Sequence, residues 1–299
     1  MRPYVIGVDA GGTKTSVCAF DLEGQLIYHG VGAAANFSEN PMAWKHVEDA
    51  VDTCIEVTEG QYAYIAVGAS GICGAGMEKE MQTKLQNRYH CQSRVVDDGR
   101  LALQAKLRGR DGVLVISGTG SVAYGKVGRR LIRTGGWGLL LDDRGSGTAI
   151  VLEAFRGLAK SQDEGRSLTA MEKGLLEQLG CPSPYQLPGS LHRLTKAQLA
   201  ALAPIVIEHG KQGEEEARKI LQEAGRKLAQ MGSQAADRLG LSAPYTAVSG
   251  SILEKCELVS EAFFAEWFER FPDAKLAAGE ERVEKGALWY YREEEIEKE

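Results

Sequence analysis

The sequence predicts an α/β protein made of two similar halves. In the first half, a short apolar run at residues 5–8 ends in a glycine turn, and a second strand-like run follows at residues 16–20. The same strand–turn–strand design recurs at residues 113–127. Between these two units, strand-like and helix-like patterns alternate, which is typical of a mixed sheet covered by helices. We therefore expect one such sheet in each half.

The first glycine turn has the composition of a phosphate site. Glycines let backbone N–H groups approach an anion closely, and hydroxyl and ammonium side chains add further donors. Asp9 precedes the turn, and a carboxylate beside bound phosphate suggests a bridging divalent metal, so we assign Asp9 to Mg²⁺. The candidate phosphate contacts are Gly11, Gly12, Thr13, Lys14 and Thr15. For Lys14, a purely solvated side chain is the alternative.

This turn is predicted to be a hairpin tip rather than a P-loop. In a P-loop, lysine directly follows the second glycine and a helix follows the lysine. Here Thr13 stands between Gly12 and Lys14, and the next residues predict a strand. One such turn is equally consistent with an ordinary hairpin, but the second turn repeats the design and favours a ligand. Two facing hairpins would clamp a nucleotide, and the second one contributes Gly118, Thr119 and Gly120.

Composition narrows the range of partners. The chain has 299 residues, enough for two domains, and its net charge of −6 argues against nucleic acid or an anionic membrane as the main partner. No apolar run reaches the length of a membrane span. The six cysteines are scattered without a C-x-x-C pair, which disfavours zinc, iron–sulfur and disulfide frameworks. Because the first strand starts at once, we expect no signal peptide and a cytoplasmic protein.

Three segments together resemble a known family. They are residues 9–15, residues 117–121 and the run Gly-Gly-Trp-Gly at 135–138. In this order they look like the BadF/BadG/BcrA/BcrD and N-acetylglucosamine kinase family, a branch of the sugar kinase, Hsp70 and actin superfamily. The resemblance runs along nearly the whole chain. It implies two ribonuclease-H-like domains, of the actin-like ATPase type, around a nucleotide cleft that holds ATP and Mg²⁺.

We place the domain boundary near residue 109. Residues 1–109 form the first domain, with the first hairpin and the catalytic aspartate, and residues 110–299 form the second, with a helical insert at about 165–240. The last helix is able to pack back on the first domain, and the insert is a candidate homodimer face. Apolar residues at helical spacing predict further helices at 196–208, 214–239 and 253–268.

Phosphoryl transfer to a hydroxyl requires a base, which we expect at the end of a strand. Asp97 and Asp98 both follow the strand predicted at 93–96. Because a strand alternates its faces, only one of the two carboxylates can point at the substrate. The resemblance places the base at Asp98, which is then also a sugar contact. The alternative for this Asp-Asp-Gly run is a helix cap or a turn.

The resemblance also implies sugar and adenosine contacts. For Asn36 the alternative is a turn residue, and for Trp137 it is a core aromatic. Ser249 and Gly250 stand at the adenosine-side turn, where relatives more often carry two glycines. The sugar contacts beyond the base are Asn36, Gly71, Gly136, Trp137, Asp143 and Arg144.

Arg144 departs from the family pattern, because relatives often carry an acid at this position. An arginine fork matches the geometry of a carboxylate. One hypothesis is therefore that Arg144 binds the carboxylate of N-acetylmuramic acid. The alternative is a local ion pair with Asp142.

The leading interpretation is an ATP-dependent amino-sugar kinase. It would transfer the γ-phosphate to a hydroxyl of N-acetylglucosamine or N-acetylmuramic acid, as in cell-wall recycling, and the resemblance implies the 6-hydroxyl. One alternative is an ATPase activator of a radical dehydratase or benzoyl-CoA reductase, which would hold an iron–sulfur cluster through cysteines. The other is a non-catalytic sugar sensor. Such sensors usually carry a DNA-binding helix-turn-helix, for which we expect no room before the first strand.

Overall fold

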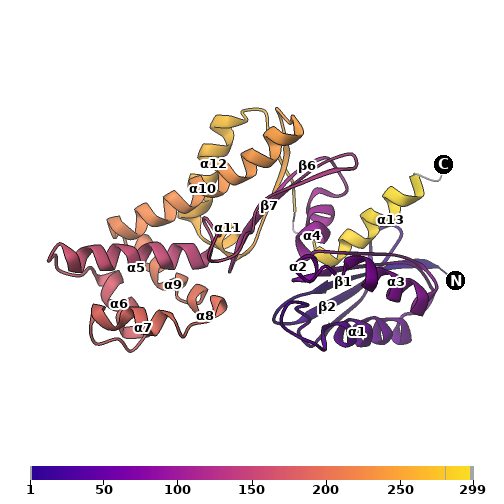
Figure 1. Ribbon diagram of the computed structural model, residues 1–299. Coiled ribbons are helices and arrows are strands. Elements are labelled where there is room, and N and C mark those ends of the chain that lie inside the picture. Colours follow the sequence, from indigo (N-terminus) through magenta and orange to yellow (C-terminus); the bar gives the residue numbers. More distant parts are fainter. Residues whose placement is uncertain (1, 280, 297–299) are drawn as a thin grey trace. The chain divides into compact units, whose positions relative to one another are not determined.

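The computed structural model describes residues 2–279 and 281–296, which fall into two compact units (Figure 1). The first unit comprises residues 2–111 together with the C-terminal residues from 277 onward. The second comprises residues 112–276. The last helix, Gly286–Ile296, belongs to the first unit. The sequence placed this helix within the second domain, at 110–299, and left open that it packs on the first.

The first unit is built on a five-stranded mixed sheet with the strand order β3-β2-β1-β4-β5. Strand β1 is antiparallel to β2 and parallel to β4, and β4 is parallel to β5. The elements of this unit are β1 (Pro3–Ala10), β2 (Thr15–Asp21), β3 (Leu26–Gly32), α1 (Ala43–Val57), β4 (Gln61–Ala69), α2 (Ile72–Ala75), α3 (Glu78–Tyr89), β5 (Gln92–Val96), α4 (Asp98–Leu107), η2 (Val283–Lys285) and α13 (Gly286–Ile296).

Alternate residues of β1 serve two separate cores. Ile6 and Val8 are fully buried in one cluster with residues of α1 and α3. Val5 points to the opposite face, where it is buried with Leu101 of α4 and Leu288 of α13. A central strand that is covered on both faces needs an unbroken apolar run, which is the pattern at the start of this chain. The C-terminal helix is thus part of the core that fixes β1.

The second unit repeats this plan. Its sheet has the order β10-β9-β6-β7-β8, in which β6 is antiparallel to β7 and parallel to β9, so β6 corresponds to β1. This confirms the prediction of an α/β protein with two similar halves. The elements are β6 (Gly112–Ser117), β7 (Ser121–Val127), β8 (Arg130–Gly135), α5 (Gly147–Asp163), α6 (Ala170–Gln178), η1 (Pro184–Gln186), α7 (Leu187–Leu191), α8 (Lys196–Ala200), α9 (Ala203–Lys211), α10 (Glu215–Leu239), β9 (Tyr245–Ser249), α11 (Ser251–Lys255), α12 (Glu257–Arg270) and β10 (Lys275–Leu276).

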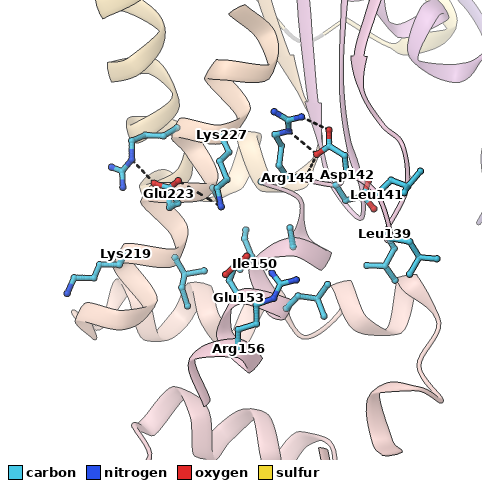
Figure 2. A pocket seen from close by; sticks show the side chains of 18 residues that line it. Leu139, Leu141, Asp142, Arg144, Ile150, Glu153, Arg156, Lys219, Glu223 and Lys227 are labelled. Atoms are coloured by element: carbon cyan, nitrogen blue, oxygen red, sulfur yellow. Dashed lines mark hydrogen bonds and ion pairs between the residues drawn. The ribbon is translucent and has the colours of Figure 1, made fainter. Parts of the chain in front are cut away.

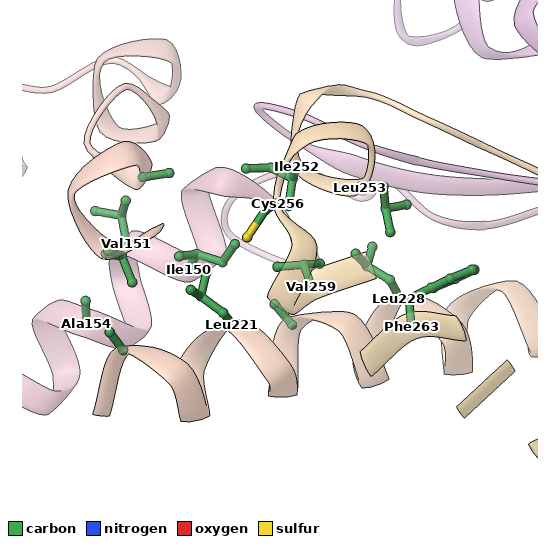
Figure 3. Close-up of a cluster of buried hydrophobic side chains, with 14 of the residues drawn as sticks. Ile150, Val151, Ala154, Leu221, Leu228, Ile252, Leu253, Cys256, Val259 and Phe263 are labelled. Carbon is green, nitrogen blue, oxygen red and sulfur yellow. The ribbon is translucent and has the colours of Figure 1, made fainter. Parts of the chain in front are cut away.

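Glycines let helix α10 pack closely on both of its neighbours. A Cβ atom at Gly225 would overlap the carbonyl oxygen of Val259 on α12. One at Gly232 would lie 2.7 Å from the Cγ2 of Val115 on β6. Around this contact, side chains of α5, α10, α11 and α12 form one apolar cluster (Figure 3). Its labelled members include Ile150, Val151, Leu221, Leu228, Ile252, Leu253 and Phe263.

Two of the predicted helices are each divided in the structure. The segment 196–208 forms α8 and α9, because Pro204 lies in the first turn of α9 and lacks the N–H that would continue the preceding helix. The segment 253–268 is interrupted at Cys256, whose φ of −103° and ψ of 98° are extended and whose side chain is buried. No helix breaker marks this second position in the sequence, so the division depends on tertiary packing.

Within residues 2–279 and 281–296, no helix is both long enough and apolar enough to cross a membrane. Helix α10 has the length, with 25 residues, but charged residues recur along it. Its apolar face is taken up by the core of the second unit.

Gly7 on β1 should tolerate no side chain. Its Cβ would overlap the backbone carbonyl of Glu284 in η2, whereas a Cβ at Gly32 on β3 would meet nothing within 4 Å. We expect Gly7→Ala to lower the free energy of unfolding by about 1–3 kcal/mol, and Gly32→Ala to change it by less than about 0.5 kcal/mol. Urea unfolding of both variants measures this, and equal stabilities would contradict the observed packing of the C-terminal segment on β1.

Candidate functional site

Two acidic residues meet at one edge of the first sheet. Parallel strands bring their carboxyl ends to the same edge, and β1, β4 and β5 all end here. Asp9 on β1 is in register with Gly68 on β4, which is in turn in register with Val96 on β5. Asp98 begins α4 just after β5, and a Cβ at Gly68 would lie 3.2 Å from the Asp98 Cα. Gly68 therefore separates the predicted metal ligand from the predicted base.

The two carboxyl groups have perturbed acidities. Burial raises the pKa of Asp9 to about 7, the charges of Asp98 and Glu284 add to this effect, and Lys14 opposes it. Burial and the neighbouring Asp97 charge also raise the pKa of Asp98, against hydrogen bonds from the Gly99 N–H and the Ser70 hydroxyl. Both side chains belong to residues that remain partly accessible. Several carboxylates around an accessible point suit a hard divalent cation such as Mg²⁺, which prefers oxygen ligands.

Asp97 and Asp98 have different roles in the local structure. Asp97 is the N-cap of α4, and its Oδ1 accepts a hydrogen bond from the Arg100 N–H at 2.9 Å. Its Oδ2 lies 3.5 Å from the Cys73 Sγ. The helix-cap alternative thus applies to Asp97. Asp98 lies inside the helix, and its carboxylate accepts hydrogen bonds from the Gly99 N–H at 2.8 Å, from the Ser70 hydroxyl and from its own backbone N–H.

The first glycine turn is a hairpin tip, as predicted. Ala10 pairs with Thr15 across the antiparallel β1–β2 ladder, and the Gly11 N–H donates to the Lys14 carbonyl at 3.0 Å. Thr15 differs from its predicted role. It is fully buried, and its hydroxyl donates to the Ala33 carbonyl at 2.6 Å. The Thr15 side chain therefore ties the hairpin to the following loop and offers no exposed atom to a phosphate.

The predicted sugar contacts of the first unit lie beside this hairpin. The Ala35 N–H donates to the Gly11 carbonyl at 2.9 Å, which places Asn36 next to the turn. Asn36 Oδ1 accepts from the Ser38 N–H at 3.0 Å, so the residue also shapes its loop. A Cβ at Gly71 would lie 2.5 Å from that Oδ1, and one at Gly12 would lie 3.9 Å from the Asn36 amide nitrogen. Gly71 has a φ of +78°, a further reason for glycine.

Lys14 and Thr13 are the two exposed side chains of the turn. The positive charge of Lys14 lowers the pKa of Asp9, against the stronger effect of burial. The glycines of the turn, Gly11 and Gly12, are also accessible. Apart from Thr15, the residues predicted to bind phosphate in this unit therefore lie on its surface, next to the Asp9 carboxylate.

The second glycine turn is held by the start of α5. Ser117 pairs with Ser121, and the Gly118 N–H donates to the Gly120 carbonyl at 2.9 Å. The Gly147 N–H donates to the Gly118 carbonyl at 2.8 Å. The predicted adenosine-side turn lies against the same hairpin. Gly250 has a φ of +93°, and a Cβ there would overlap the Ser117 carbonyl and lie 3.1 Å from the Gly118 nitrogen. Ser249, the last residue of β9, precedes it and is half-buried.

Asp143 reaches the tip of this hairpin together with a lysine that sequence reasoning missed. Asp143 is buried and forms an ion pair with Lys196 at 2.7 Å. A Cβ at Gly120 would lie 3.1 Å from Asp143 Oδ1 and 2.7 Å from Lys196 Nζ. The motif Thr195 to Gln198 signals the start of a helix in the sequence. No local pattern, however, indicates that this helix places its first lysine on a hairpin more than seventy residues away.

Arg144 forms the ion pair that was the alternative to carboxylate binding. Its Nε and Nη2 lie 2.8 Å and 2.7 Å from the two oxygens of Asp142, and this pairing lowers the pKa of Asp142. Trp137 is 68% exposed, so the core-aromatic alternative is wrong. The Arg133 guanidinium lies 6.0 Å from the centre of its ring. Gly136 next to it has a φ of +71°.

A cavity of about 530 Å³ opens between the loop 139–145 and helices α5 and α10 (Figure 2). Most of its charged side chains form ion pairs with one another. Arg144 pairs with Asp142, and Glu223 lies 3.9 Å from Lys227. Apolar residues including Leu139 and Ile150 complete the wall. The lining includes Asp143 and Arg144 from the predicted sugar segment, but the glycine hairpin lies outside it. The cavity is therefore a neighbour of the hairpin site, and its lining carries five basic and four acidic side chains.

The sequence model of the BadF/BadG/BcrA/BcrD ATPase family matches residues 6–277 of this chain. The chain belongs to this family. The N-acetylmuramic acid/N-acetylglucosamine kinase of Clostridium acetobutylicum is 31% identical to this chain over 237 residues, which cover 75% of this chain and 76% of that protein. The N-acetyl-D-glucosamine kinase of Dictyostelium discoideum is 26% identical over 299 residues, covering 92% and 93%.

A solved structure shows the same fold. The protein comes from Chromobacterium violaceum and is assigned as an N-acetylglucosamine kinase. It superposes with a TM-score of 0.75 at 21% identity, and the match covers 96% of this chain and 98% of the other. Together with the two matching sheets, this gives two actin-like domains.

The raised pKa of Asp9 predicts a pH-dependent stability. Between about pH 4 and pH 7 the folded protein keeps a proton on Asp9 that the unfolded chain has lost, so wild-type stability falls as pH rises through this window. Asp9→Asn removes this loss. We expect the stability of the variant relative to wild type to rise by about 2–4 kcal/mol between pH 4.5 and pH 8, measured by urea unfolding.

Asp142→Asn is the control with the opposite sign. The pKa of Asp142 is lowered by Arg144, so wild type gains stability from this group above the usual pKa of an aspartate and loses it on acidification. That variant should therefore lose stability at pH 8 and much less at low pH. A pH-independent difference for Asp9→Asn would contradict the proposed environment of Asp9.

Proposed function

We propose that this protein is an ATP-dependent amino-sugar kinase that phosphorylates a hydroxyl of N-acetylglucosamine or N-acetylmuramic acid. The observation that carries the proposal is the meeting of Asp9 and Asp98 on either side of Gly68, next to the loop of Asn36 and Gly71. A metal-binding carboxylate, a base and a polar substrate loop are the parts that phosphoryl transfer to an alcohol requires. The kinase names of the two family relatives support the same activity.

In this proposal the oxygen of the sugar hydroxyl forms a bond to the γ-phosphorus, and Asp98 accepts the proton of that hydroxyl. The bond between that phosphorus and the bridging oxygen breaks, and ADP leaves with its electron pair. The raised pKa of Asp98 makes its carboxylate a better proton acceptor than an ordinary aspartate. In the first unit, Asn36 would contact the sugar and the glycine hairpin beside Asp9 would contact phosphate. In the second unit, Asp143 is a candidate sugar contact and the hairpin at Gly118 to Gly120 is a candidate phosphate contact.

ATP and Mg²⁺ are the cofactors of this proposal. Asp9 is the residue that would hold Mg²⁺, through water, and the burial that raises its pKa to about 7 supports this assignment, because a cation would offset the cost of a buried negative charge. When bound, Mg²⁺ neutralises charge on the triphosphate. The glycine turns contribute backbone N–H groups, which need no reorganisation to meet an anion.

The proposal is tested by measuring ADP release from Mg²⁺-ATP with a panel of sugars. The panel holds N-acetylglucosamine, N-acetylmuramic acid, glucosamine and glucose. We expect turnover that depends on the sugar and is highest with an N-acetylated one. ADP release that is the same with and without every sugar would contradict a kinase and favour the activator-type ATPase. ATP and sugar binding without turnover would favour the sensor.

Asp98→Asn should abolish most of the turnover, while Asp97→Asn should not. Removing a general base lowers kcat by about 10²–10⁴-fold. Asparagine at position 97 still accepts the cap hydrogen bond from the Arg100 N–H, so that variant serves as a matched control for charge and fold. Steady-state kinetics and a thermal melt of each variant decide the assignment. An equal loss of kcat in both variants would contradict the separate roles.

Arg144→Ala should affect both N-acetylated sugars equally. The guanidinium is paired with Asp142 in this structure, so its removal disturbs the loop rather than a substrate carboxylate. We expect the ratio of kcat/KM for N-acetylmuramic acid to that for N-acetylglucosamine to stay within about twofold of wild type, a difference below about 0.5 kcal/mol. A selective loss on N-acetylmuramic acid would instead show that Arg144 binds the carboxylate.

A further inference from the structure

Lys196 lies at the tip of the second glycine hairpin. It is the first residue of α8, and Thr195 before it forms a capping box. The Thr195 hydroxyl accepts from the Gln198 N–H at 3.2 Å, and the Thr195 N–H donates to the Gln198 side chain at 2.9 Å. These two hydrogen bonds fix where the helix begins, and thereby the origin of the Lys196 side chain.

The ammonium group of Lys196 is positioned by Asp143 and by the absence of a side chain at Gly120. The Asp143 side chain is 4% exposed and lies 2.7 Å from Lys196 Nζ, whereas the Lys196 side chain is 38% exposed. A Cβ at Gly120 would fall 2.7 Å from the same Nζ. The ammonium thus lies directly on the backbone of the turn, with one side held by a buried carboxylate and another side accessible.

The Lys196 ammonium would reduce the repulsion between the Asp143 carboxylate and a phosphate bound at the turn. A phosphate bound at Gly118, Thr119 and Gly120 would lie close to the Asp143 carboxylate, which is 3.1 Å from the position of a Gly120 Cβ. Two negative groups at such a distance repel each other unless a cation stands between them. Lys196 is the cation that the structure places there. Lysine is a common phosphate ligand because its ammonium is a compact charge with three donors.

We propose that Lys196 is a nucleotide-phosphate contact of the second hairpin and that Asp143 positions it. This inference rests on the proposed function, because it assumes that the second hairpin binds ATP. It assigns a role to a residue outside the glycine motifs, in the helical insert of the second unit. It also gives Asp143 a second role, because the carboxylate that we assign to the sugar holds the lysine that we assign to the phosphate.

The test is the binding of ATP and of adenosine, measured by calorimetry without sugar. Lys196→Met keeps most of the side-chain volume and removes the charge. We expect ATP to bind about tenfold or more weakly, as the loss of a hydrogen bond to a charged group implies, and adenosine to bind as to wild type. Lys196→Arg should recover most of the ATP affinity. Lys160→Met is the matched control, since Lys160 also lies on a helix of this unit in an ion pair, at 3.8 Å from Glu164.

The outcomes separate this inference from the proposed function. An unchanged ATP affinity in Lys196→Met, or equal losses for ATP and adenosine, would overturn the phosphate contact, whether or not a sugar is phosphorylated. If wild type does not bind ATP at all, the inference is also overturned. If ATP affinity depends on Lys196 but no sugar is turned over, the contact stands and only the kinase proposal fails. Should Lys196→Met not fold, Lys196→Gln, which also removes the charge, takes its place, and a wild-type ATP affinity in that variant would overturn the contact.

Discussion

The carboxyl groups of Asp9 and Asp98 lie together at the edge where three parallel strands end, and most of the first unit serves to hold them there. Burial raises both pKa values, the charge of Asp98 adds to the effect on Asp9, and the charge of Asp97 adds to the effect on Asp98, so negative charge at this edge is unfavourable in the absence of a cation or a proton. A fold keeps such a pair only if its surroundings are rigid. Here the rigidity comes from β1, which is covered on one face by α1 and α3 and on the other by α4 and the C-terminal helix α13. The two buried carboxyl groups therefore destabilise the folded state. Ionisable groups with strongly perturbed pKa values occur most often at functional sites.

The second unit repeats the sheet but not the acidic pair. Its hairpin has the same place in the strand order, between β6 and β7. The charged groups at its tip are Asp143 and Lys196, which compensate each other, and a glycine at position 250 lets the adjacent turn approach the hairpin. The two units thus share a strand order but carry different functional groups beside their glycine hairpins. The first carries carboxylates suited to a metal and to proton transfer, and the second carries a backbone turn with a lysine suited to phosphate.

Local patterns in the sequence predicted those features that depend on neighbouring residues. The hairpin at Gly11 and Gly12 is an example, since the strand runs on both sides and the intervening turn are contiguous. Features that depend on distant residues were missed or misassigned. Thr15 belongs to the glycine motif, but the carbonyl of Ala33 determines where its hydroxyl points. The sequence assigns Lys196 only to a helical insert, because its contact with the turn at Gly120 depends on the tertiary structure and has no local sequence pattern. Family resemblance predicts roles for Asp98 and Asp143, but it does not predict the ion pair of Asp143 with Lys196 or that of Arg144 with Asp142.

The proposed reaction moves the γ-phosphate of ATP to a sugar, so the identity of the phosphorylated product distinguishes it from the hydrolysis of ATP. The measurement is a phosphorus NMR spectrum of the wild-type protein after incubation with Mg²⁺-ATP and N-acetylglucosamine or N-acetylmuramic acid. If Asp98 is the base for the sugar hydroxyl, as proposed, the spectrum will contain a sugar phosphomonoester in an amount equal to the ADP formed. ADP accompanied by inorganic phosphate, with no phosphomonoester for either sugar, would contradict the proposed reaction.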